Sequence, residues 1–335
     1  MKAAQLDSYN KNYQLTVRDI PTPKISDTEA LVQVKYAAVN PLENLIGTGS
    51  VKIIQNYKMP HTMGNEITGE IVEIGSKVNA FKVGDVIYSR LPIKTGGGFA
   101  EFVAVDSDAI ALLPKNLNPQ NGAAAPLTGL TAYQGLHEEL NAHAGQTVLI
   151  PGGSGSFGQM AIPIAKDMGL HVIVTGSGAQ KERTIAIGAD EYLDYKTENY
   201  WEKLKDVDLV IDTRGVQELN HELSVIKPGG RLLSLIMGPN KQFAKDRDFG
   251  FVKSFLFSMN GKKFDNAAAK KGASYRFIFV RSDGEQLKKI TKIIEDNNIV
   301  PAVDPTEFTL DDINDALKLI TSGRPKGKVL IKVSD

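Results

Sequence analysis

The sequence predicts an α/β protein in which a doubly wound parallel sheet is joined to a second, β-rich domain. In the middle of the chain, from Thr147 onward, short apolar runs alternate with helical patterns. In the first third, short alternating runs are separated by glycine turns. At 335 residues the chain also exceeds one usual hydrophobic core, which favours two domains.

The β-rich part covers residues 1 to about 121. Ala30–Ala37 alternates between apolar and polar residues as a half-buried strand does, and Gly69–Ile74 and Val83–Tyr88 are similar. Turn signals at Gly75-Ser76 and Gly96–Gly98 separate such runs. Short strands with this punctuation predict a small barrel or sandwich.

The second part begins with a helical pattern, Leu127–Leu140, and continues as a βα alternation. Its predicted strands are Thr147–Ile150, His171–Thr175, Glu191–Leu193, Leu209–Asp212, Arg231–Ile236 and Tyr275–Val280. Near the end of the chain the pattern predicts helices over Asp283–Asn298 and Leu310–Thr321 and a final strand at Lys328–Ile331.

The first strand of this alternation ends in a glycine-rich turn, Gly153–Gly158, with the spacing GxGxxG. The first glycine allows a tight turn, the second lets backbone approach a pyrophosphate, and the third packs helix against strand. Free amides at the start of the following helix favour a phosphate. A plain strand–helix turn is the alternative, but this context favours dinucleotide binding by Gly153, Gly155, Ser156, Phe157 and Gly158.

Composition narrows the class further. Lys+Arg and Asp+Glu both number 39, so no net charge attracts the chain to nucleic acid or to an anionic membrane. The absence of cysteine excludes disulfides and thiolate zinc sites. The first residues lack the apolar core of a signal peptide, and Lys253 interrupts the apolar stretch Phe249–Met259, so we expect a cytoplasmic protein without a membrane span.

The residues after the second predicted strand indicate which dinucleotide binds. NAD-specific sites place an acid there to bind the ribose hydroxyls, whereas this chain has Ser177, Lys181 and Arg183. A hydroxyl and two bases suit a 2′-phosphate. The alternative is a solvated helix start, but cations at a helix N-terminus oppose its dipole. We therefore predict NADPH over NADH.

Several motifs stand in order along the chain: Asn40-Pro41-Leu42-Glu43, then Gly64-Asn65-Glu66 followed by Gly69, Gly75 and Gly84-Asp85, and then Pro126–Tyr133. With the opening stretch, DGEQL at 283–287 and GRPKGKVLIKV at 323–333, they resemble the zinc-independent quinone oxidoreductases of the medium-chain dehydrogenase/reductase superfamily. The resemblance implies a GroES-like β-barrel domain, residues 1–121 and 300–335, around a Rossmann NADPH-binding domain, residues 122–299.

The metal ligands of zinc-dependent relatives are missing. By motif their positions look like Asn40, Asn65 and Ala124, and neutral amides and a methyl group cannot replace thiolate and imidazole. The five histidines form no HxxxH pair. We predict that the chain holds no metal.

The resemblance also implies the remaining roles. Tyr195 is expected to contact the phosphate, and the nicotinamide is expected in a cleft between the domains, near Thr128, Thr213, Leu235 and Phe279. Asn40 is the candidate donor to a substrate oxygen. Relatives carry a tyrosine near positions 49–51 that this chain lacks, so the final proton is expected from Tyr57 or from water.

The activity that follows is NADPH-dependent hydride transfer to a quinone or to the double bond of an α,β-unsaturated carbonyl. A homodimer joined through edge strands is expected, as in relatives. An alcohol dehydrogenase is disfavoured by the missing zinc ligands. The non-enzymatic alternative is an NADPH-binding module, crystallin-like or RNA-binding, although no basic, aromatic-rich patch favours nucleic acid.

Overall fold

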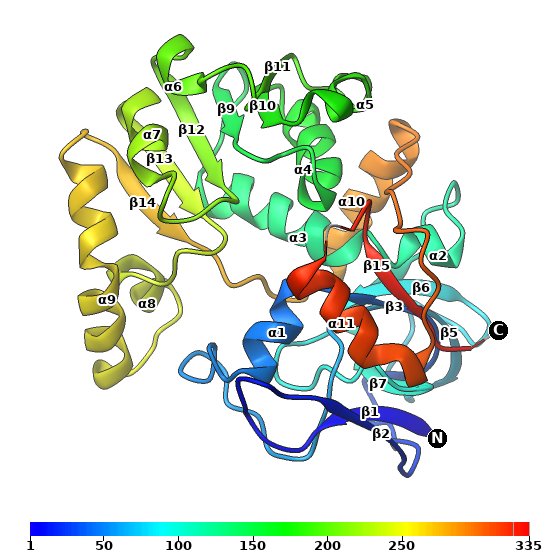
Figure 1. Ribbon diagram of the computed structural model, residues 1–335. Helices are drawn as coiled ribbons and strands as arrows, with labels where there is room; N and C mark the ends of the chain where they lie inside the picture. Colours follow the sequence, from blue (N-terminus) through cyan, green and yellow to red (C-terminus); the bar gives the residue numbers. More distant parts are fainter. Residues whose placement is uncertain (324, 335) are drawn as a thin grey trace. The chain divides into compact units, whose positions relative to one another are not determined.

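The computed structural model describes residues 1–323 and 325–334, so Arg324 of the C-terminal motif lies outside the described residues. The chain forms two compact units (Figure 1): unit 1 is Met1–Leu130 with Arg281–Asp335, and unit 2 is Thr131–Val280. The sequence placed these boundaries at 121/122 and 299/300. The difference at the second boundary has a simple cause, because helix α10 (Gly284–Asp296) packs on strand β8 of unit 1.

Unit 1 contains two antiparallel sheets. The larger has the order β15-β3-β5-β6-β8, with β7 also paired to β3, and the smaller has the order β2-β1-β4. Val329 pairs with Val39, so the last strand of the chain completes the larger sheet, as expected. The strands are β1 (Lys2–Leu6), β2 (Leu15–Asp19), β3 (Glu29–Val39), β4 (His61–Thr62), β5 (Glu66–Ile74), β6 (Val86–Arg90), β7 (Phe102–Asp106), β8 (Ile110–Leu112) and β15 (Val329–Lys332).

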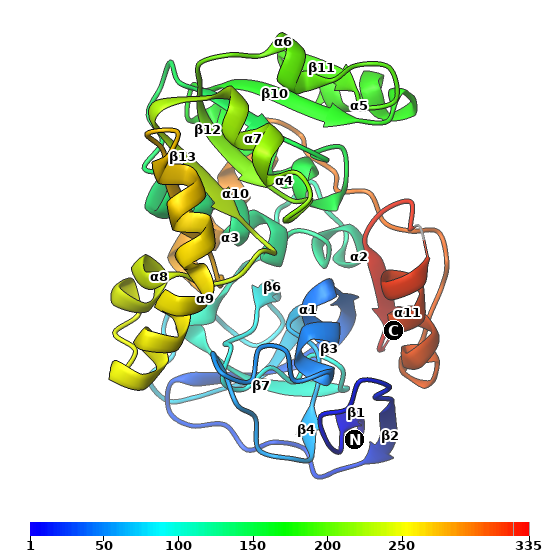
Figure 2. The same ribbon diagram turned by 60° about the vertical axis from the view of Figure 1, so that its left-hand side comes forward.

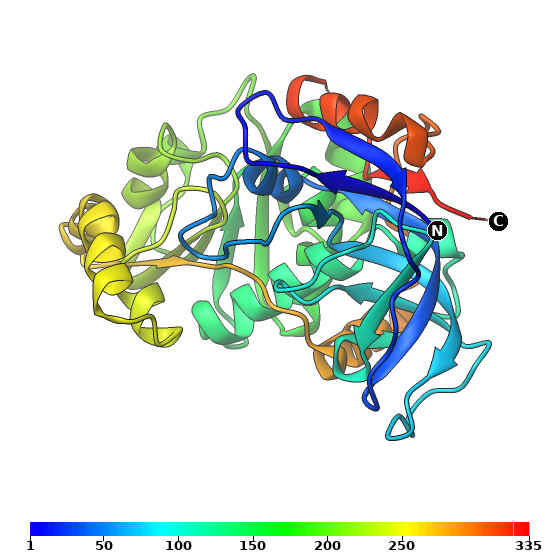
Figure 3. The same cartoon turned by 90° about the horizontal axis from the view of Figure 1, so that it is seen from below.

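Helices close the ends of unit 1. Figure 3 shows the red helix α11 beside the blue strands β1 and β2, where the Asn314 side chain exchanges two 2.9 Å hydrogen bonds with the backbone of Leu15. Helix α10 buries Leu287, Ile290 and Ile294, the apolar face read from its 3.6-residue period. The helices are α1 (Pro41–Gly47), α2 (Pro119–Gly122), α3 (Pro126–Gln134), which crosses the unit boundary, α10 and α11 (Ile313–Ser322).

Unit 2 is built on a parallel sheet with the order β11-β10-β9-β12-β13-β14 (Figure 2). The strand order reverses between β9 and β12, so the carboxyl ends of these two strands form the switch point at which doubly wound sheets bind ligands. The strands are β9 (Thr147–Ile150), β10 (His171–Gly176), β11 (Glu191–Asp194), β12 (Val207–Asp212), β13 (Ile226–Ser234) and β14 (Ser274–Phe277). Its helices are α4 (Ser156–Asp167), α5 (Lys181–Ala186), α6 (Tyr200–Lys203), α7 (Leu219–Val225), α8 (Lys241–Asp246) and α9 (Phe251–Ala269).

Some elements differ from their predicted extents. The helix expected over Leu127–Leu140 is α3 to Gln134 and then a π-helical turn, Gly135–Glu139. The apolar stretch Phe249–Met259 contributes its residues from Phe251 onward to the first half of α9, a helix that the sequence pattern did not reveal because α9 has apolar residues on two faces. Among the described residues, no helix is long and apolar enough to cross a membrane.

Candidate functional site

The glycine turn of unit 2 joins β9 to α4, and its geometry explains the first and third glycines. A Cβ on Gly158 would lie 1.6 Å from the carbonyl oxygen of Gly153, so any side chain there would force strand and helix apart. A Cβ on Gly153 would lie 2.8 Å from the Ile150 side chain. Both positions therefore need glycine for packing within the turn itself.

Gly155 differs, because the nearest atom to a Cβ placed there is the Gly152 carbonyl oxygen at 3.8 Å. The fold thus leaves open space above this residue. Gly155 is also the N-cap of the twelve-residue helix α4, and no side chain caps that end. Ser156 and Phe157 begin the helix, so its first amides face the same region. An uncapped helix start beside open space suits a pyrophosphate.

Two further predicted residues of unit 2 adjoin this turn. The Thr213 hydroxyl, just after β12, donates a 2.6 Å hydrogen bond to the carbonyl of Pro151 in the turn. Leu235, just after β13, donates its backbone N–H to the carbonyl of Asp212 at 3.0 Å. The loops that follow β9, β12 and β13 are therefore tied together at one edge of the sheet. Phe279 lies farther along the chain, and its carbonyl accepts a hydrogen bond from Arg247.

A buried carboxylate that the sequence reading did not single out fixes these loops. Asp212 is fully buried, and its Oδ1 accepts hydrogen bonds from the backbone N–H groups of Arg214 (2.7 Å) and Gly215 (2.6 Å). Its Oδ2 accepts from the Ser234 hydroxyl at 2.6 Å. The Ser234 oxygen in turn accepts from the backbone of Ile236 and Met237. One carboxylate–hydroxyl pair thus holds the turns after β12 and β13.

Glu222, on α7, is fully buried near this pair. Burial, and then the charge of Asp212, raise the pKa of Glu222 to about 10. Glu222 is therefore neutral at physiological pH, and the loop amides bind the neighbouring Asp212 carboxyl group instead. The one sequence signal for Asp212 was its place as the last residue of the VDLVID strand, because a carboxylate at a strand end can accept hydrogen bonds from the next turn.

The predicted adenosine end of the site lies after β10. Ser177 is half-buried, with its carbonyl accepting a 2.6 Å hydrogen bond from the Tyr192 hydroxyl, and Lys181 is exposed at the start of α5. Tyr195 is 61% exposed, so its ring is available to a ligand. Sequence reasoning missed Asp194, at the end of β11, whose Oδ2 lies 2.5 Å from where a Cβ of Gly178 would be. An acid does therefore reach the tip of β10, from the neighbouring strand.

In unit 1 the predicted substrate residue Asn40 belongs to a closed, buried network. Its Nδ2 donates to Glu66 Oε2 at 3.1 Å and to the carbonyl of Ala38 at 3.4 Å, and its Oδ1 accepts from Lys328 Nζ at 2.7 Å. Lys328 also pairs with Glu66 at 2.8 Å, and Glu66 Oε1 accepts the backbone N–H of Leu127. Both N–H groups of the Asn40 amide are engaged, so donation to a substrate oxygen would require this network to rearrange.

Glu43 continues the network on the other side of Asn40. Its carboxylate accepts from the backbone N–H of Asn40 (2.7 Å) and from Asn65 Nδ2 (2.8 Å). Burial raises the pKa of Glu43 to about 7, with the hydrogen bonds opposing the shift and Glu66 adding to it. Asn40 and Asn65, which stand at positions of zinc ligands in relatives, are thus each bound to a carboxylate. Among residues 1–323 and 325–334, no group of three or more His, Asp or Glu is arranged to hold a metal ion.

The other two candidates of unit 1 are the buried Tyr57 and the half-buried Thr128. Tyr57 is 6% exposed and stacks on His61, with ring centroids 4.2 Å apart. Burial raises the pKa of Tyr57 to about 12, with Glu43 contributing, and lowers the pKa of His61 to about 4. Tyr57 is therefore a protonated phenol and His61 a neutral imidazole at pH 7. The Thr128 hydroxyl donates back to the carbonyls of Ala124 and Ala125, just before the start of its helix α3.

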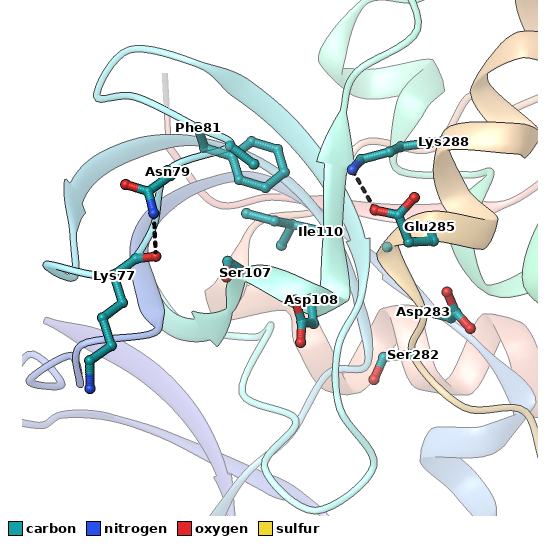
Figure 4. Close-up of a pocket in the computed structure, with 12 residues that line it drawn as sticks. Lys77, Asn79, Phe81, Ser107, Asp108, Ile110, Ser282, Asp283, Glu285 and Lys288 are labelled. Atoms are coloured by element: carbon teal, nitrogen blue, oxygen red, sulfur yellow. Dashed lines mark hydrogen bonds and ion pairs between the residues drawn. The ribbon is translucent and has the colours of Figure 1, made fainter.

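A cavity of about 610 Å³ lies elsewhere in unit 1, where α10 begins (Figure 4). Its charged side chains are partly paired with one another, as Lys288 is with Glu285 at 2.6 Å. Phe81 and Ile110 supply its apolar wall. No residue predicted for cofactor or substrate lines this cavity, so it is separate from the candidate site.

Comparison with known proteins identifies the family. The model described as the alcohol dehydrogenase GroES-like domain matches residues 26–115, and the one described as zinc-binding dehydrogenase matches residues 187–331. A 2-methylene-furan-3-one reductase from Solanum lycopersicum is 30% identical over 322 residues, spanning 93% of this chain and 74% of that protein. The chain belongs to the zinc-independent, quinone oxidoreductase-like branch of the medium-chain dehydrogenase/reductase superfamily.

Two further similarities agree with this assignment. An NADPH-dependent alkenal/one oxidoreductase from Arabidopsis thaliana is 28% identical and matches 93% of this chain and 74% of its own length. The structure of the quinone oxidoreductase from Coxiella burnetii superposes with a TM-score of 0.81 at 26% identity, covering 100% of this chain and 99% of that one. The predicted GroES-like and Rossmann folds are thereby confirmed. The chain is an oxidoreductase that binds a nicotinamide cofactor.

Proposed function

We propose that this medium-chain dehydrogenase/reductase is a zinc-independent, NADPH-dependent reductase of quinones or α,β-unsaturated carbonyls. The observation that carries the proposal is the glycine turn of unit 2. Gly155 leaves open the space that a Cβ would fill, beside the uncapped start of α4. Relatives named for quinone, alkenal/one and furanone reduction point to the same class of acceptor.

The roles of the chain's own residues follow from the contacts above. Gly153, Gly155, Ser156, Phe157 and Gly158 would bind the pyrophosphate. Thr213 and the backbone at Leu235 would hold the nicotinamide end, kept in place by Asp212 and Ser234. When bound, the nicotinamide supplies the hydride, and the protein contributes orientation and exclusion of water. Thr128 and Phe279 remain proposed contacts.

Reduction of a quinone or enone builds negative charge on an oxygen, which a hydrogen-bond donor stabilises. Asn40 was the expected donor, but its N–H groups bond to Glu66 and Ala38. We therefore propose that Asn40 positions the Glu66–Lys328 pair, and that Tyr57 is the better candidate to donate to the oxygen. The Tyr57 phenol keeps its proton at neutral pH. Replacing Tyr57 with Phe is then expected to lower kcat by about tenfold or more while the Kd for NADPH is unchanged.

The absorbance of NADPH tests the function directly: a quinone or an alkenal would consume NADPH, whereas an alcohol with NADP⁺ would form it. We expect turnover with the quinone or the alkenal and none with the alcohol, because Asn40 and Asn65 stand where zinc-dependent relatives carry the ligands of the metal that polarises the alcohol oxygen. Tight NADPH binding without turnover of any acceptor would instead support the alternative of a binding module.

The preference for NADPH depends on two opposed groups after β10 and β11. Lys181 favours a 2′-phosphate, whereas Asp194 repels it. We expect Lys181→Gln to weaken NADPH binding by about fivefold, and Asp194→Asn to strengthen it, with NADH little changed by the first variant. Lys205→Gln, at an exposed lysine just before β12, is the matched control. Equal affinities of the wild-type protein for NADPH and NADH would overturn this preference.

Assembly and location remain proposals as well. β14 ends the unit 2 sheet with one edge unpaired in the order of the sheet. We propose a homodimer joined through this edge, measured by light scattering of the purified protein. The cytoplasmic location expected from the sequence is likewise proposed, with no nucleic acid as a partner.

A further inference from the structure

Helix α9 is apolar on two opposite faces. Its inner face buries Phe257, Gly261, Phe264 and Ala268, which recur at the four- and three-residue spacing of one helix stripe. This face packs closely, since a Cβ on Gly261 would lie 2.4 Å from the backbone of Asn240. Figures 1 and 3 show α9 at the β14 end of unit 2, beside α8.

The outer face of α9 carries five large apolar side chains that the chain itself does not cover. Their exposed fractions are 85% for Phe251, 70% for Val252, 56% for Phe255, 39% for Leu256 and 61% for Met259. At 100° per residue these positions fall on one side of the helix, opposite the buried stripe. A contiguous group of this size, including two phenylalanines, indicates a surface that meets a partner.

Basic residues continue this face toward the C-terminal end of the helix. Lys262 and Lys263 are exposed one turn beyond Met259, and Lys270 and Lys271 follow where the helix ends. The only acid in α9 is Asp265, which is partly buried and accepts a 2.7 Å hydrogen bond from Asn240. The net charge of the chain is zero, so this local excess of positive charge is hidden in the composition.

We propose that the outer face of α9 docks on the surface of an anionic lipid bilayer. Aromatic and aliphatic side chains beside lysines are the composition of helices that lie in the bilayer interface, with the apolar groups among the acyl chains and the ammonium groups at the phosphates. A second copy of this chain fits less well, because it would bring the same lysines to the same interface. The proposal concerns a surface away from the glycine turn and does not depend on the identity of the electron acceptor.

Vesicle flotation of the full-length protein tests the proposal. We expect the wild-type protein to float with vesicles of phosphatidylcholine and phosphatidylglycerol in equal parts, and not with phosphatidylcholine alone. Added salt should release it, because the attraction of the lysines is screened. Phe251→Ser/Phe255→Ser is expected to weaken binding by about tenfold or more. Lys262→Gln/Lys263→Gln should weaken binding to the anionic vesicles by about 25-fold, since each lysine near an anionic surface contributes about fivefold.

The matched control is Val83→Ser/Val300→Ser, which removes two exposed aliphatic side chains from unit 1 and should float as the wild type does. Thermal unfolding of every variant checks that it is folded, and the lysine variant keeps the test valid if the phenylalanine variant is not. Equal flotation with both vesicle types, or none with either, would overturn the proposal. So would a wild-type dimer that the Phe251→Ser/Phe255→Ser variant converts to a monomer, because the face would then bind a second copy.

Discussion

The buried polar networks of unit 1 and unit 2 differ in the groups that they hold in place. In unit 1, Glu66, Asn40 and Lys328 satisfy one another, and a lysine balances the carboxylate. In unit 2, the Asp212 carboxyl group accepts hydrogen bonds from the Ser234 hydroxyl and from backbone N–H groups of the loop after β12. The first network is closed on itself. The second network supports the loops after β12 and β13, whose functional groups point away from it.

The difference teaches how this branch of the family works without zinc. At positions where relatives place metal ligands, Asn40 and Asn65 are tied to Glu66 and Glu43. The positive charge there is the ammonium group of Lys328, the residue just before the last strand of the chain and 288 positions from Asn40. We infer that this region stabilises unit 1, whereas the loops held by Asp212 serve the cofactor. The two networks should therefore respond differently to substitution.

The largest effect is expected where the closed network loses its cation. Lys328→Met leaves the Glu66 carboxylate buried without its ion-pair partner, and we expect the free energy of unfolding to fall by about 3–5 kcal/mol. Urea denaturation measures it. Lys332→Met, at an exposed position at the end of β15, is the control. The double variant Glu66→Gln/Lys328→Met should recover part of the loss, and equal losses in the single and double variants would contradict this account of the network.

The closed network should also make stability depend on pH. The pKa of Glu43 is raised from 4.5 to about 7 in the folded protein. The folded state therefore binds this proton more tightly than the unfolded state, so the stabilisation is complete below pH 4.5 and lost as pH rises through about 7. We expect a loss of up to about 3 kcal/mol across this interval.

Denaturation curves at several pH values, compared between the wild type and Glu43→Gln, isolate that contribution. The variant should show a flatter dependence between pH 5 and 7, because the glutamine amide does not titrate in this range. Glu70→Gln, a half-buried position of β5, is the control and should keep the wild-type slope. Identical slopes for Glu43→Gln and the wild type would show that Glu43 keeps the same pKa in the unfolded state.

For the network of Asp212 and Ser234 in unit 2 we expect a smaller loss of stability, together with weaker binding of the cofactor. Asp212→Asn replaces one of two accepting oxygens with an NH2 group, which should cost about 2 kcal/mol and loosen the loop that carries Thr213. Binding of NADPH, followed by fluorescence, should weaken by about tenfold. Asp208→Asn is matched, because Asp208 is a buried acid at the other end of β12, where it accepts from Thr147 and pairs with Lys227. If both variants weakened NADPH equally, Asp212 would have no special role.

The sequence predicted the parts of the molecule that depend on local patterns. The period of α10, the apolar strands of the unit 2 sheet and the glycine turn were all readable, because each is a run of neighbouring residues with one spacing. The role of Lys328 could not be predicted, because nothing near it in sequence shows that Glu66 and Asn40 lie beside it. Asp194 was missed for a similar reason: it reaches the tip of β10 from the adjacent strand. Such partners are set by strand order, which the pattern of a single chain does not encode.

The glycine turn allows stability and NADPH binding to be tested separately, because substitutions at two of its glycines should affect the two properties differently. Gly155→Ala adds a methyl group whose nearest neighbour in the turn is 3.8 Å away, so the free energy of unfolding should change by no more than about 0.5 kcal/mol. The same methyl group occupies the space proposed for the pyrophosphate, so NADPH binding should weaken by about tenfold or more.

Gly158→Ala is the contrasting variant, because its methyl group would meet the Gly153 carbonyl at 1.6 Å and should reduce stability and binding together. Thermal unfolding and NADPH titration of both variants give the four values needed. If Gly155→Ala bound NADPH as tightly as the wild type, the open space at the turn would not be the pyrophosphate site. The loops held by Asp212 would then have to serve another part of the ligand.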